Sequence, residues 1–153
     1  MRNLWFKKKK KEAEKFPVKE VSFEEIKYAV HEYSRDLAPN IPLKILVKDD
    51  LSLDYTLLAP ILKAIPDKTY YMSKETYDLF EEEDKHIAYA LDTVQRAVDN
   101  YIAQKKELPI IDYDPYRKVS FHKLEQLKLI DERPEMDFYI TDEEQLVTTI
   151  KPK

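Results

Sequence analysis

The sequence predicts an α+β fold: a single compact domain in which about five helices pack on a small, mostly antiparallel sheet, preceded by a disordered basic N-terminal arm. Three observations lead to this prediction. Several segments carry apolar residues at intervals of three and four, as amphipathic helices do, whereas a few short runs alternate as strands do. Helices outnumber strands and do not alternate with them regularly, which disfavours a doubly wound sheet. The length of 153 residues suits one domain.

The first 20 residues differ from the remainder in charge. Residues 1–20 hold eight Lys or Arg against three Asp or Glu, a balance of +5, whereas residues 21–153 carry a balance of −9. Pro17 lies near the junction. Because a run of like charge repels itself, we expect a flexible arm over 1–20 and the folded α+β domain over 21–153.

The first helix of the folded part is expected to run from Ser22 to about Leu37. Ser22 and Glu25 fit a capping box, in which each side chain accepts a hydrogen bond from the other residue's backbone N–H. One apolar stripe follows, made of Phe23, Ile26, Val30, Tyr33 and Leu37. Pro39 and Pro42 then end the helix.

The segment after this helix leaves two interpretations open. Residues 43–47 alternate as a short strand does, and the alternation of residues 51–57 would extend it into a hairpin across two aspartates. The apolar spacing of residues 57–65 instead fits a helix with Asp54 as its N-cap and Pro60 near its start. We favour the strand at 43–47 and the helix after Asp54.

The remaining elements are expected in the following order. They are a strand at 68–72, a short helix at 73–80 capped by Ser73, a long helix at 84–106, an extended segment at 110–115, a helix at 120–129 capped by Ser120, and two strands near 136–141 and 146–150. The long helix has the clearest pattern, and its stripe consists of Ile87, Leu91, Val94, Val98, Tyr101 and Ile102.

The composition excludes several kinds of functional site. The chain has no glycine and no cysteine. Glycine-dependent phosphate loops, the G-x-S-x-G nucleophile elbow, thiol catalysis and cysteine-ligated metals are therefore all excluded. His31 is followed by Glu32, but Arg35 stands where the zinc-binding H-E-x-x-H motif requires its second histidine. We expect no cofactor and no metal.

The N-terminal arm points to a surface rather than to a catalytic role. Its candidate contact residues are Trp5, Phe6, Lys7, Lys8, Lys9, Lys10 and Lys11. Five lysines near an anionic bilayer gain roughly 5 kcal/mol before ordering costs, which suits reversible attachment. The alternative is a solvated tail. The acidic body makes nucleic acid an unlikely partner, and the chain has no signal-peptide or membrane-spanning pattern, so we expect a cytoplasmic protein that sometimes contacts the inner face of the cell membrane.

One cluster suggests chemistry. Asp112 and Asp114 follow an apolar run, as in the nucleophile loop of haloacid-dehalogenase-type phosphatases, but Pro115 and Tyr116 do not fit that motif. A small hydrolase or phosphate-handling enzyme using Asp112, Asp114, Arg117 and Lys118 is therefore the alternative function. The simpler interpretation is a proline turn in which the aspartates accept hydrogen bonds from nearby backbone amides.

The tyrosines allow two interpretations as well. The chain has 11 of them. Tyr70, Tyr71, Tyr113 and Tyr116 would suit an aromatic recognition surface, because tyrosine offers contact area and a hydroxyl. They would equally suit half-buried positions in the wall of the fold, which we favour.

Several segments resemble one known family. They are WFK at 5–7, YMSKET at 71–76, ALDTVQRAVD at 90–99, DPYRKVS at 114–120 and YITDEE at 139–144. The chain resembles a small uncharacterised family of low-GC Gram-positive bacteria, which is known only as a domain of unknown function. The resemblance implies no activity, ligand or partner. Our first hypothesis is a non-enzymatic cytosolic interaction module with an unidentified protein partner.

Overall fold

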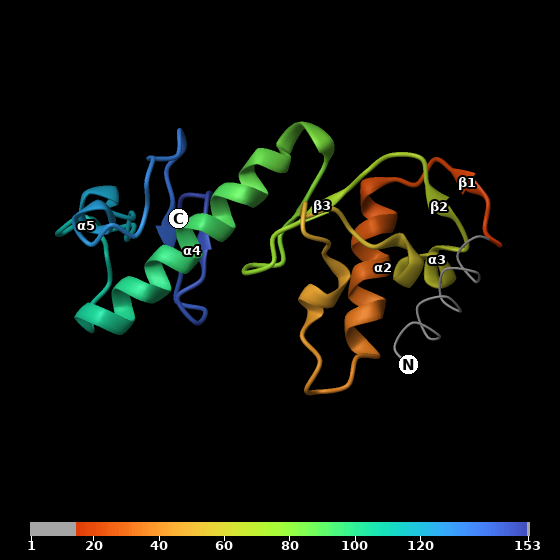
Figure 1. The fold of residues 1–153 in the computed structure, drawn as a ribbon, viewed down its shortest axis with the longest axis horizontal. Helices are drawn as coiled ribbons and strands as arrows, with labels where there is room; N and C mark the ends of the chain where they lie inside the picture. The colour runs from red at the N-terminus through yellow and green to blue at the C-terminus, as the bar shows by residue number, and fades with distance from the viewer. Residues whose placement is uncertain (1–14, 153) are drawn as a thin grey trace. The chain divides into compact units, whose positions relative to one another are not determined.

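The computed structural model describes residues 15–152, and the chain divides into two compact units after Ala88 (Figure 1). The elements of the first unit are β1 (Val18–Lys19), α2 (Phe23–Arg35), η1 (Leu43–Leu46), α3 (Tyr55–Leu62), β2 (Ile65–Pro66), β3 (Tyr71–Met72), β4 (Leu79–Phe80) and η2 (Glu82–Asp84). The second unit receives most of α4 (Lys85–Lys105), and then has α5 (Phe121–Gln126), β5 (Tyr139–Ile140) and β6 (Val147–Thr148).

The mixed helix and strand content is confirmed, but two details of the expected fold are wrong. The described residues contain four α-helices rather than about five. Their strands form three separate two-stranded sheets instead of one sheet. The pairs β3–β4 and β5–β6 are antiparallel, whereas β1 and β2 are parallel.

Helix α2 begins as its sequence predicts. The Glu25 backbone N–H donates to the Ser22 hydroxyl at 3.1 Å, and the Ser22 N–H donates to the Glu25 carboxylate at 3.2 Å. Helix α3 also begins at the predicted cap, since the Asp54 side chain accepts from the Thr56 N–H at 3.0 Å. The helical interpretation of the segment after Asp54 is therefore confirmed. Part of the hairpin exists too, as an isolated bridge between Val47 and Leu53.

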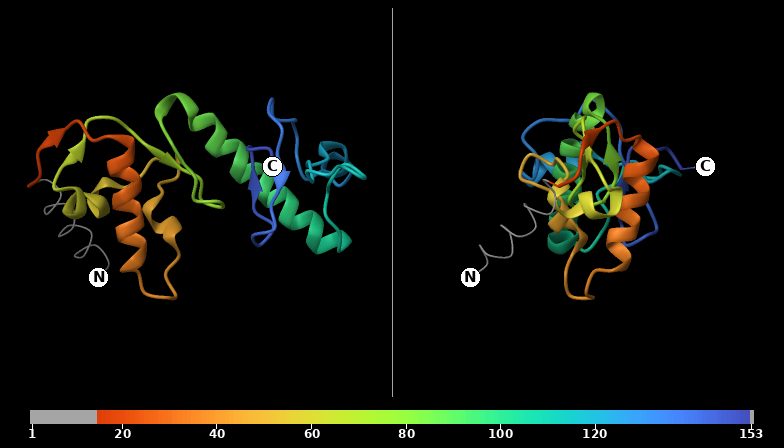
Figure 2. Two further views of the ribbon diagram at one scale, coloured as in Figure 1. Left: turned by 180° about the vertical axis from the view of Figure 1, so that it is seen from behind. Right: turned by 90° about the vertical axis from the view of Figure 1, so that its right-hand side faces the viewer.

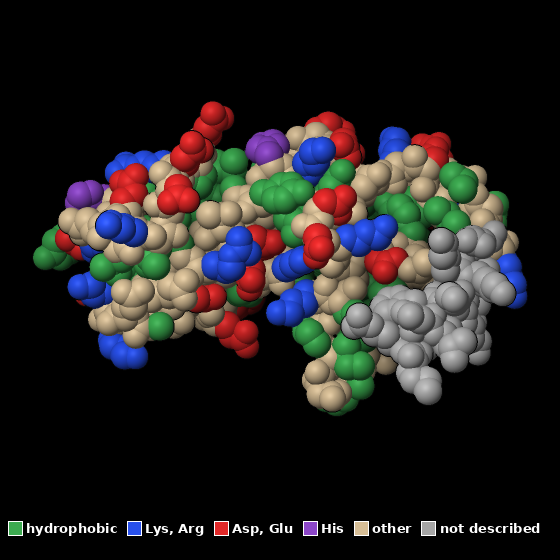
Figure 3. Space-filling view, in the orientation of Figure 1, with side chains coloured by type: hydrophobic (Ala, Val, Ile, Leu, Met, Phe, Trp, Pro, Cys, Tyr) green, Lys and Arg blue, Asp and Glu red, His purple; other side chains and the backbone are tan. Residues whose placement is uncertain are grey.

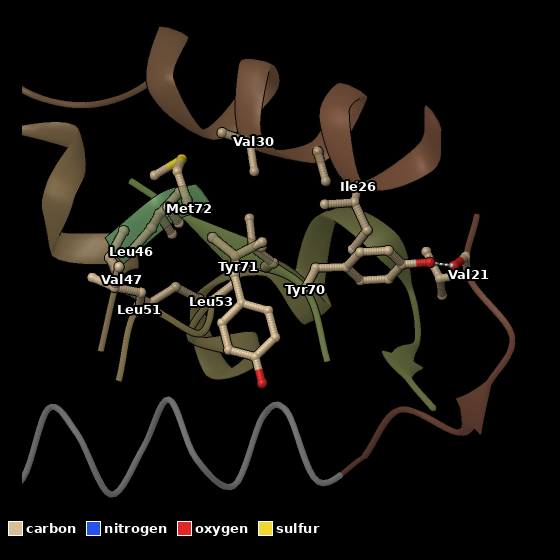
Figure 4. Packing of buried hydrophobic residues seen from close by; sticks show 14 of the residues in the cluster. Val21, Ile26, Val30, Leu46, Val47, Leu51, Leu53, Tyr70, Tyr71 and Met72 are labelled. Atoms are coloured by element: carbon tan, nitrogen blue, oxygen red, sulfur yellow. Dashed lines mark hydrogen bonds between the residues drawn. The ribbon is translucent and has the colours of Figure 1, made fainter. Parts of the chain in front are cut away.

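The core of the first unit is built from residues of α2, η1, α3 and β3. Figure 4 shows Ile26 and Val30 on α2 pointing toward the segment that holds Tyr70 and Met72. The Tyr70 ring is buried, and its hydroxyl donates a hydrogen bond of 2.7 Å to the Val21 carbonyl. An apolar cluster thus includes a tyrosine whose polar atom is satisfied, which avoids the cost of an unpaired hydroxyl.

The expected strand at 43–47 is wrong. Residues Leu43–Leu46 form a 3-10 turn, in which the Val47 N–H donates to the Lys44 carbonyl at 3.0 Å. The three-residue period turns Leu43 and Leu46 toward the core and leaves Ile45 44% exposed. Alternation would instead have put Ile45 on the same face as Leu43.

The expected helix at 73–80 is also wrong. The Ser73 hydroxyl accepts from the Thr76 N–H at 2.9 Å, as an N-cap would, but the chain then reverses. Tyr77 adopts a left-handed φ of 63°, and the Ser73 N–H donates to the Asp78 carbonyl at 2.9 Å. The serine therefore stabilises the turn of the β3–β4 hairpin, since the same side-chain bond serves turns and helix starts.

Residues 15–20 were expected to belong to the arm. Val18 and Lys19 instead form β1, which pairs in register with Ile65 and Pro66 of β2. Among the described residues, this strand pair joins the segment before residue 21 to the first unit.

In the second unit, α4 confirms the strongest prediction. Leu91, Val94 and Val98 are buried as expected. Ile87 and Ile102, at the two ends of the stripe, are only partly buried. The β5–β6 hairpin lies beside this helix in Figure 1 and in the left view of Figure 2. Helix α5 begins at the predicted cap, because the Lys123 N–H donates to the Ser120 hydroxyl at 3.3 Å.

A buried glutamine connects α4 to the β5–β6 turn. Glu144 and Gln145 both have left-handed φ angles, 53° and 60°, which tight hairpin turns usually assign to glycine or asparagine. The Gln95 amide donates to the Gln145 carbonyl at 3.2 Å and accepts from the Val147 N–H at 2.8 Å. Gln95 thus holds in place a turn whose own residues disfavour it.

Three helices are followed by a lysine in the left-handed conformation that glycine usually adopts at a helix end. Lys63, Lys106 and Lys128 follow the last turns of α3, α4 and α5, and their φ angles of 57°, 59° and 58° are left-handed. Glycine is the usual residue there because a Cβ raises the energy of this conformation. Lysine supplies a positive charge at the negative end of the helix dipole, which offsets part of that cost.

Candidate functional site

The candidate site lies entirely in the second unit, on a loop closed by an antiparallel bridge between Ile110 and Val119. We call residues 110–119 the Tyr113 loop. The Ile111 N–H donates to the Lys118 carbonyl at 2.9 Å and narrows the base of the loop. The four charged residues that the sequence singles out all belong to it.

The Asp114 side chain shapes the loop by accepting hydrogen bonds from backbone N–H groups. Its Oδ1 accepts from the Tyr116 N–H at 2.7 Å and from the Lys118 N–H at 3.3 Å. This is the hydrogen-bonding pattern expected of an aspartate in a proline turn, with Pro115 directly after it. Asp114 therefore acts here as a turn residue.

Asp112 fastens the other side of the loop to α5. Its carboxylate accepts from the Lys123 ammonium at 2.8 Å, and the same ammonium donates to the Ile110 carbonyl at 2.8 Å. The hydrogen bond that Lys123 donates to the Asp112 carboxylate raises the pKa of Lys123 above its ordinary value. Lys123 therefore stays charged throughout the physiological range, which suits an anchor and not a general base.

Arg117 combines an unusual backbone conformation with a partly buried guanidinium. Its φ is 57°, its guanidinium contacts the Asp142 carboxylate, and Nη2 donates to the Thr141 carbonyl at 3.3 Å. Its Nε is the one buried side-chain polar atom in residues 15–152 that lacks a hydrogen-bond partner. Lys118 forms a separate ion pair with Asp137 at 3.3 Å.

These contacts do not bring the four charged residues together. Asp112 and Lys118 pair with Lys123 and Asp137 respectively, and Asp114 bonds to backbone amides. An enzyme requires its acid, base and electrophilic groups to converge on one concave site. Of the four, only Arg117 lines the pocket described below. The enzymatic alternative stays a prediction, and each of these contacts has a structural explanation.

The tyrosines divide between the two interpretations. Tyr70 and Tyr71 are buried in the first unit, as wall residues would be. Tyr113 is fully exposed at the tip of its loop, with Ile111 43% exposed and Tyr116 36% exposed nearby in the same loop. The second unit thus presents apolar and aromatic side chains on a loop held by hydrogen bonds.

Next to this loop lies an open pocket of about 490 Å³. We call it the Tyr116 pocket. Its lining residues are Pro115, Tyr116, Arg117, Ile140, Thr141, Asp142, Glu143 and Pro152. The Lys151 ammonium lies 4.1 Å from the centre of the Tyr116 ring, which is a cation–π contact. The pocket therefore combines apolar walls, an aromatic face and two carboxylates.

The candidate membrane residues Trp5, Phe6, Lys7, Lys8, Lys9, Lys10 and Lys11 lie outside the described residues. Within residues 15–152, no helix is both long and apolar enough to cross a bilayer. Over the same range, the structure places no three His, Asp or Glu side chains where they would hold a metal ion. On the face shown in Figure 3, basic and acidic side chains are interspersed.

A family model described as "Protein of unknown function (DUF3939)" matches residues 16–149. The chain belongs to the DUF3939 family. This confirms the resemblance to a domain of unknown function, while the expected distribution among low-GC Gram-positive bacteria stays a prediction. No curated protein and no solved structure matches the chain. Membership of the DUF3939 family assigns no activity.

Sequence reasoning missed part of this DUF3939 site. Thr141 lies at the end of one predicted strand, Asp142 and Glu143 lie between that strand and the next, and Lys151 carried no signal at all. The contacts of Arg117 with Thr141 and Asp142 join residues 24 and 25 positions apart. No local pattern predicts such pairs. The acidic Asp-Glu-Glu run at 142–144 was the only available hint.

Proposed function

We propose that this protein is a non-enzymatic interaction module of the cytoplasm, and that the Tyr113 loop is its protein-binding surface. The observation that carries the proposal is the full exposure of Tyr113 on a loop whose conformation is already fixed. Tyrosine is enriched among residues that dominate binding energy, because it offers a large contact area with few rotatable bonds.

The loop is fixed on both sides of Tyr113. Asp112 is held by Lys123, and Asp114 accepts two backbone hydrogen bonds. A partner therefore meets a surface that loses little conformational entropy on binding, which favours affinity. Tyr113 itself has a left-handed φ of 66°, an unfavourable conformation that these contacts sustain.

The test compares partner capture by the full-length chain and by Tyr113→Ala from cytoplasm of the source cells. Alanine also carries a Cβ, so the substitution does not relax the loop backbone. Loss of a central tyrosine contact should reduce retention of a bound partner about tenfold or more. Tyr28→Ala is the matched control, because Tyr28 is a 63% exposed tyrosine of the first unit. A partner retained equally by all three chains, or no partner retained at all, would contradict the proposal.

The second candidate function is reversible contact with the anionic inner face of the membrane through the basic arm. The supporting observation is an apolar surface in the first unit, where Ile41 is 40% and Ile45 44% exposed. Together with Pro42, Lys44 and Lys74 they line an open pocket of about 430 Å³. Exposed isoleucines beside lysines suit the boundary between lipid headgroups and acyl chains.

Co-sedimentation with anionic vesicles tests this candidate. Binding should occur at low salt, fall steeply by roughly 0.5 M salt because of charge screening, and disappear on deletion of residues 1–11. Ile41→Ser/Ile45→Ser should weaken binding without changing its salt dependence. Vesicles without anionic lipid are the control. A full-length chain that remains in the supernatant at low salt would show that the membrane candidate is wrong.

A further inference from the structure

The Tyr116 pocket contains a contact that resembles recognition of a ligand. Lys151 comes from the segment after β6, and its ammonium lies over the face of the Tyr116 ring. Pro152, the next residue, forms part of the pocket wall. The chain thus places one of its own lysines where the side chain of another molecule would bind.

The charges of the pocket favour a cation over an anion. Arg117 is the pocket's only basic lining residue, and its guanidinium is already committed to Asp142 and to the Thr141 carbonyl, with Nε buried. The Asp142 side chain nevertheless remains 93% exposed, so its carboxylate faces solvent despite the contact. Glu143 forms no ion pair within the described residues and also lines the pocket. An incoming anion would meet two carboxylates, and the nearby Lys151 ammonium lies over the Tyr116 ring.

The apolar walls suit the stem of a long side chain. Pro115, Ile140 and Pro152 line the pocket beside the aromatic ring. Lysine and arginine bury their methylene groups along such surfaces while the charged end reaches a carboxylate or an aromatic face. The pocket offers apolar walls, an aromatic face and carboxylates together. A neutral side chain would not use the carboxylates, and a free metal ion would not use the apolar walls.

We propose that the Tyr116 pocket binds a lysine or arginine side chain of a protein partner, and that Lys151 occupies the aromatic face in the free protein. This inference rests on the proposed interaction function and names the chemistry of the partner segment that would lie beside the Tyr113 loop. Partner binding displaces Lys151 from the ring. The internal contact therefore lowers the affinity for the partner's cation without abolishing it.

The experiment adds small probes to the full-length chain. Binding of each probe is monitored by NMR signals of the tyrosine rings and of the Thr141 and Glu143 amides. The cationic probes are Nα-acetyl-lysine methylamide and its arginine counterpart. The norleucine counterpart has an uncharged stem of similar length and serves as the control. Each cationic probe should give saturable shifts at the Tyr116 ring, and norleucine should give none.

Variants then test the role of each group. Lys151→Met should lower the dissociation constant for the lysine probe about twofold to fivefold, the factor expected for removing an exposed competing cation–π contact. Lys128→Met is the matched control, because Lys128 is an exposed lysine that does not line the pocket. Tyr116→Leu and Glu143→Gln should each weaken binding, with unchanged thermal melting because both side chains are exposed.

Each outcome bears on the inference. Equal shifts with norleucine would show an apolar pocket only, and the same affinity in Lys151→Met as in the parent would overturn the competition by Lys151. No saturable shift in Lys151→Met would overturn the cation site itself. Failure here remains distinguishable from failure of the proposed function, because Tyr113-dependent capture of a partner does not require an amine to bind the Tyr116 pocket.

Discussion

The two units use different means to hold their loops. In the first unit, side chains close in sequence cap the helices, such as Ser22 with Glu25 and Asp54 with Thr56, and tyrosine hydroxyls donate to distant backbone carbonyls around one apolar cluster. In the second unit, loops are fixed by polar side chains distant in sequence, such as Gln95 with Val147. The comparison shows that side-chain hydrogen bonds to distant backbone groups come from tyrosine hydroxyls in the first unit, and from amide or charged side chains in the unit with the candidate site.

The largest expected effect tests the apolar packing of the second unit. Leu91→Asp places a carboxylate at a position that is 1% exposed, and an unpaired buried charge costs several kcal/mol against a total stability of about 5–15 kcal/mol. We expect the second unit to unfold, with a large loss of helical circular dichroism. Thr93→Asp, at an exposed position of the same helix, is the control. A Leu91→Asp chain that melts within a few degrees of the parent would contradict the role of α4.

A smaller effect isolates the polar contacts of the second unit. Gln95→Leu keeps the volume of the side chain but leaves the Val147 N–H and the Gln145 carbonyl without their partner. We expect a loss of about 1–3 kcal/mol in the free energy of unfolding, measured by urea denaturation. Gln104→Leu, an exposed glutamine of the same helix, should change it by less than about 0.5 kcal/mol. Equal effects of the two substitutions would remove the distinction between the units.

This difference also explains what could be predicted from the sequence. The caps at Ser22, Asp54 and Ser120 were predictable because a cap is decided by residues within three positions. The stripe of α4 was predictable because its period extends over several turns. A local pattern of the same kind gave a wrong prediction at Ser73. Its hydroxyl accepts from the Thr76 N–H as a helix cap would, but this bond stabilises the turn of a hairpin.

The candidate site was predictable only in part. The Tyr113 loop was singled out by its aspartates, and the turn role of Asp114 follows from the proline after it. The Tyr116 pocket was not predictable, because it forms only when residues 115–117, 140–143 and 152 meet. The same absence of short-range signals hid the contact between Lys151 and Tyr116.

A third prediction measures the polar contribution in the first unit. Tyr70→Phe removes the hydroxyl that donates to the Val21 carbonyl and keeps the ring that stacks on Phe23. We expect a loss of about 1 kcal/mol, less than for Gln95→Leu, because one hydrogen bond is lost instead of several. Tyr77→Phe, at an exposed tyrosine of the same unit, is the control in the same denaturation assay. A loss for Tyr70→Phe larger than that for Gln95→Leu would reverse the contrast between the units.

The smallest effect concerns a feature that the two units share, the left-handed lysines after their helices. Replacing a Cβ-bearing residue at such a position by glycine relieves about 1–2 kcal/mol of backbone strain. The greater flexibility of the unfolded chain offsets about 0.4–1 kcal/mol of this gain, and the loss of the lysine charge at the helix end offsets a further part. Lys63→Gly in the first unit and Lys106→Gly in the second should therefore each raise the free energy of unfolding by about 0.5 kcal/mol. Lys105→Gly, one residue earlier and still inside α4, should lower it by up to about 1 kcal/mol, because glycine is a poor helix former. Thermal melting of the three variants checks the opposite signs. A gain at Lys63 with a loss at Lys106 would mean that the end of α4 depends on the lysine side chain itself, and that the contrast between the units extends to their helix ends.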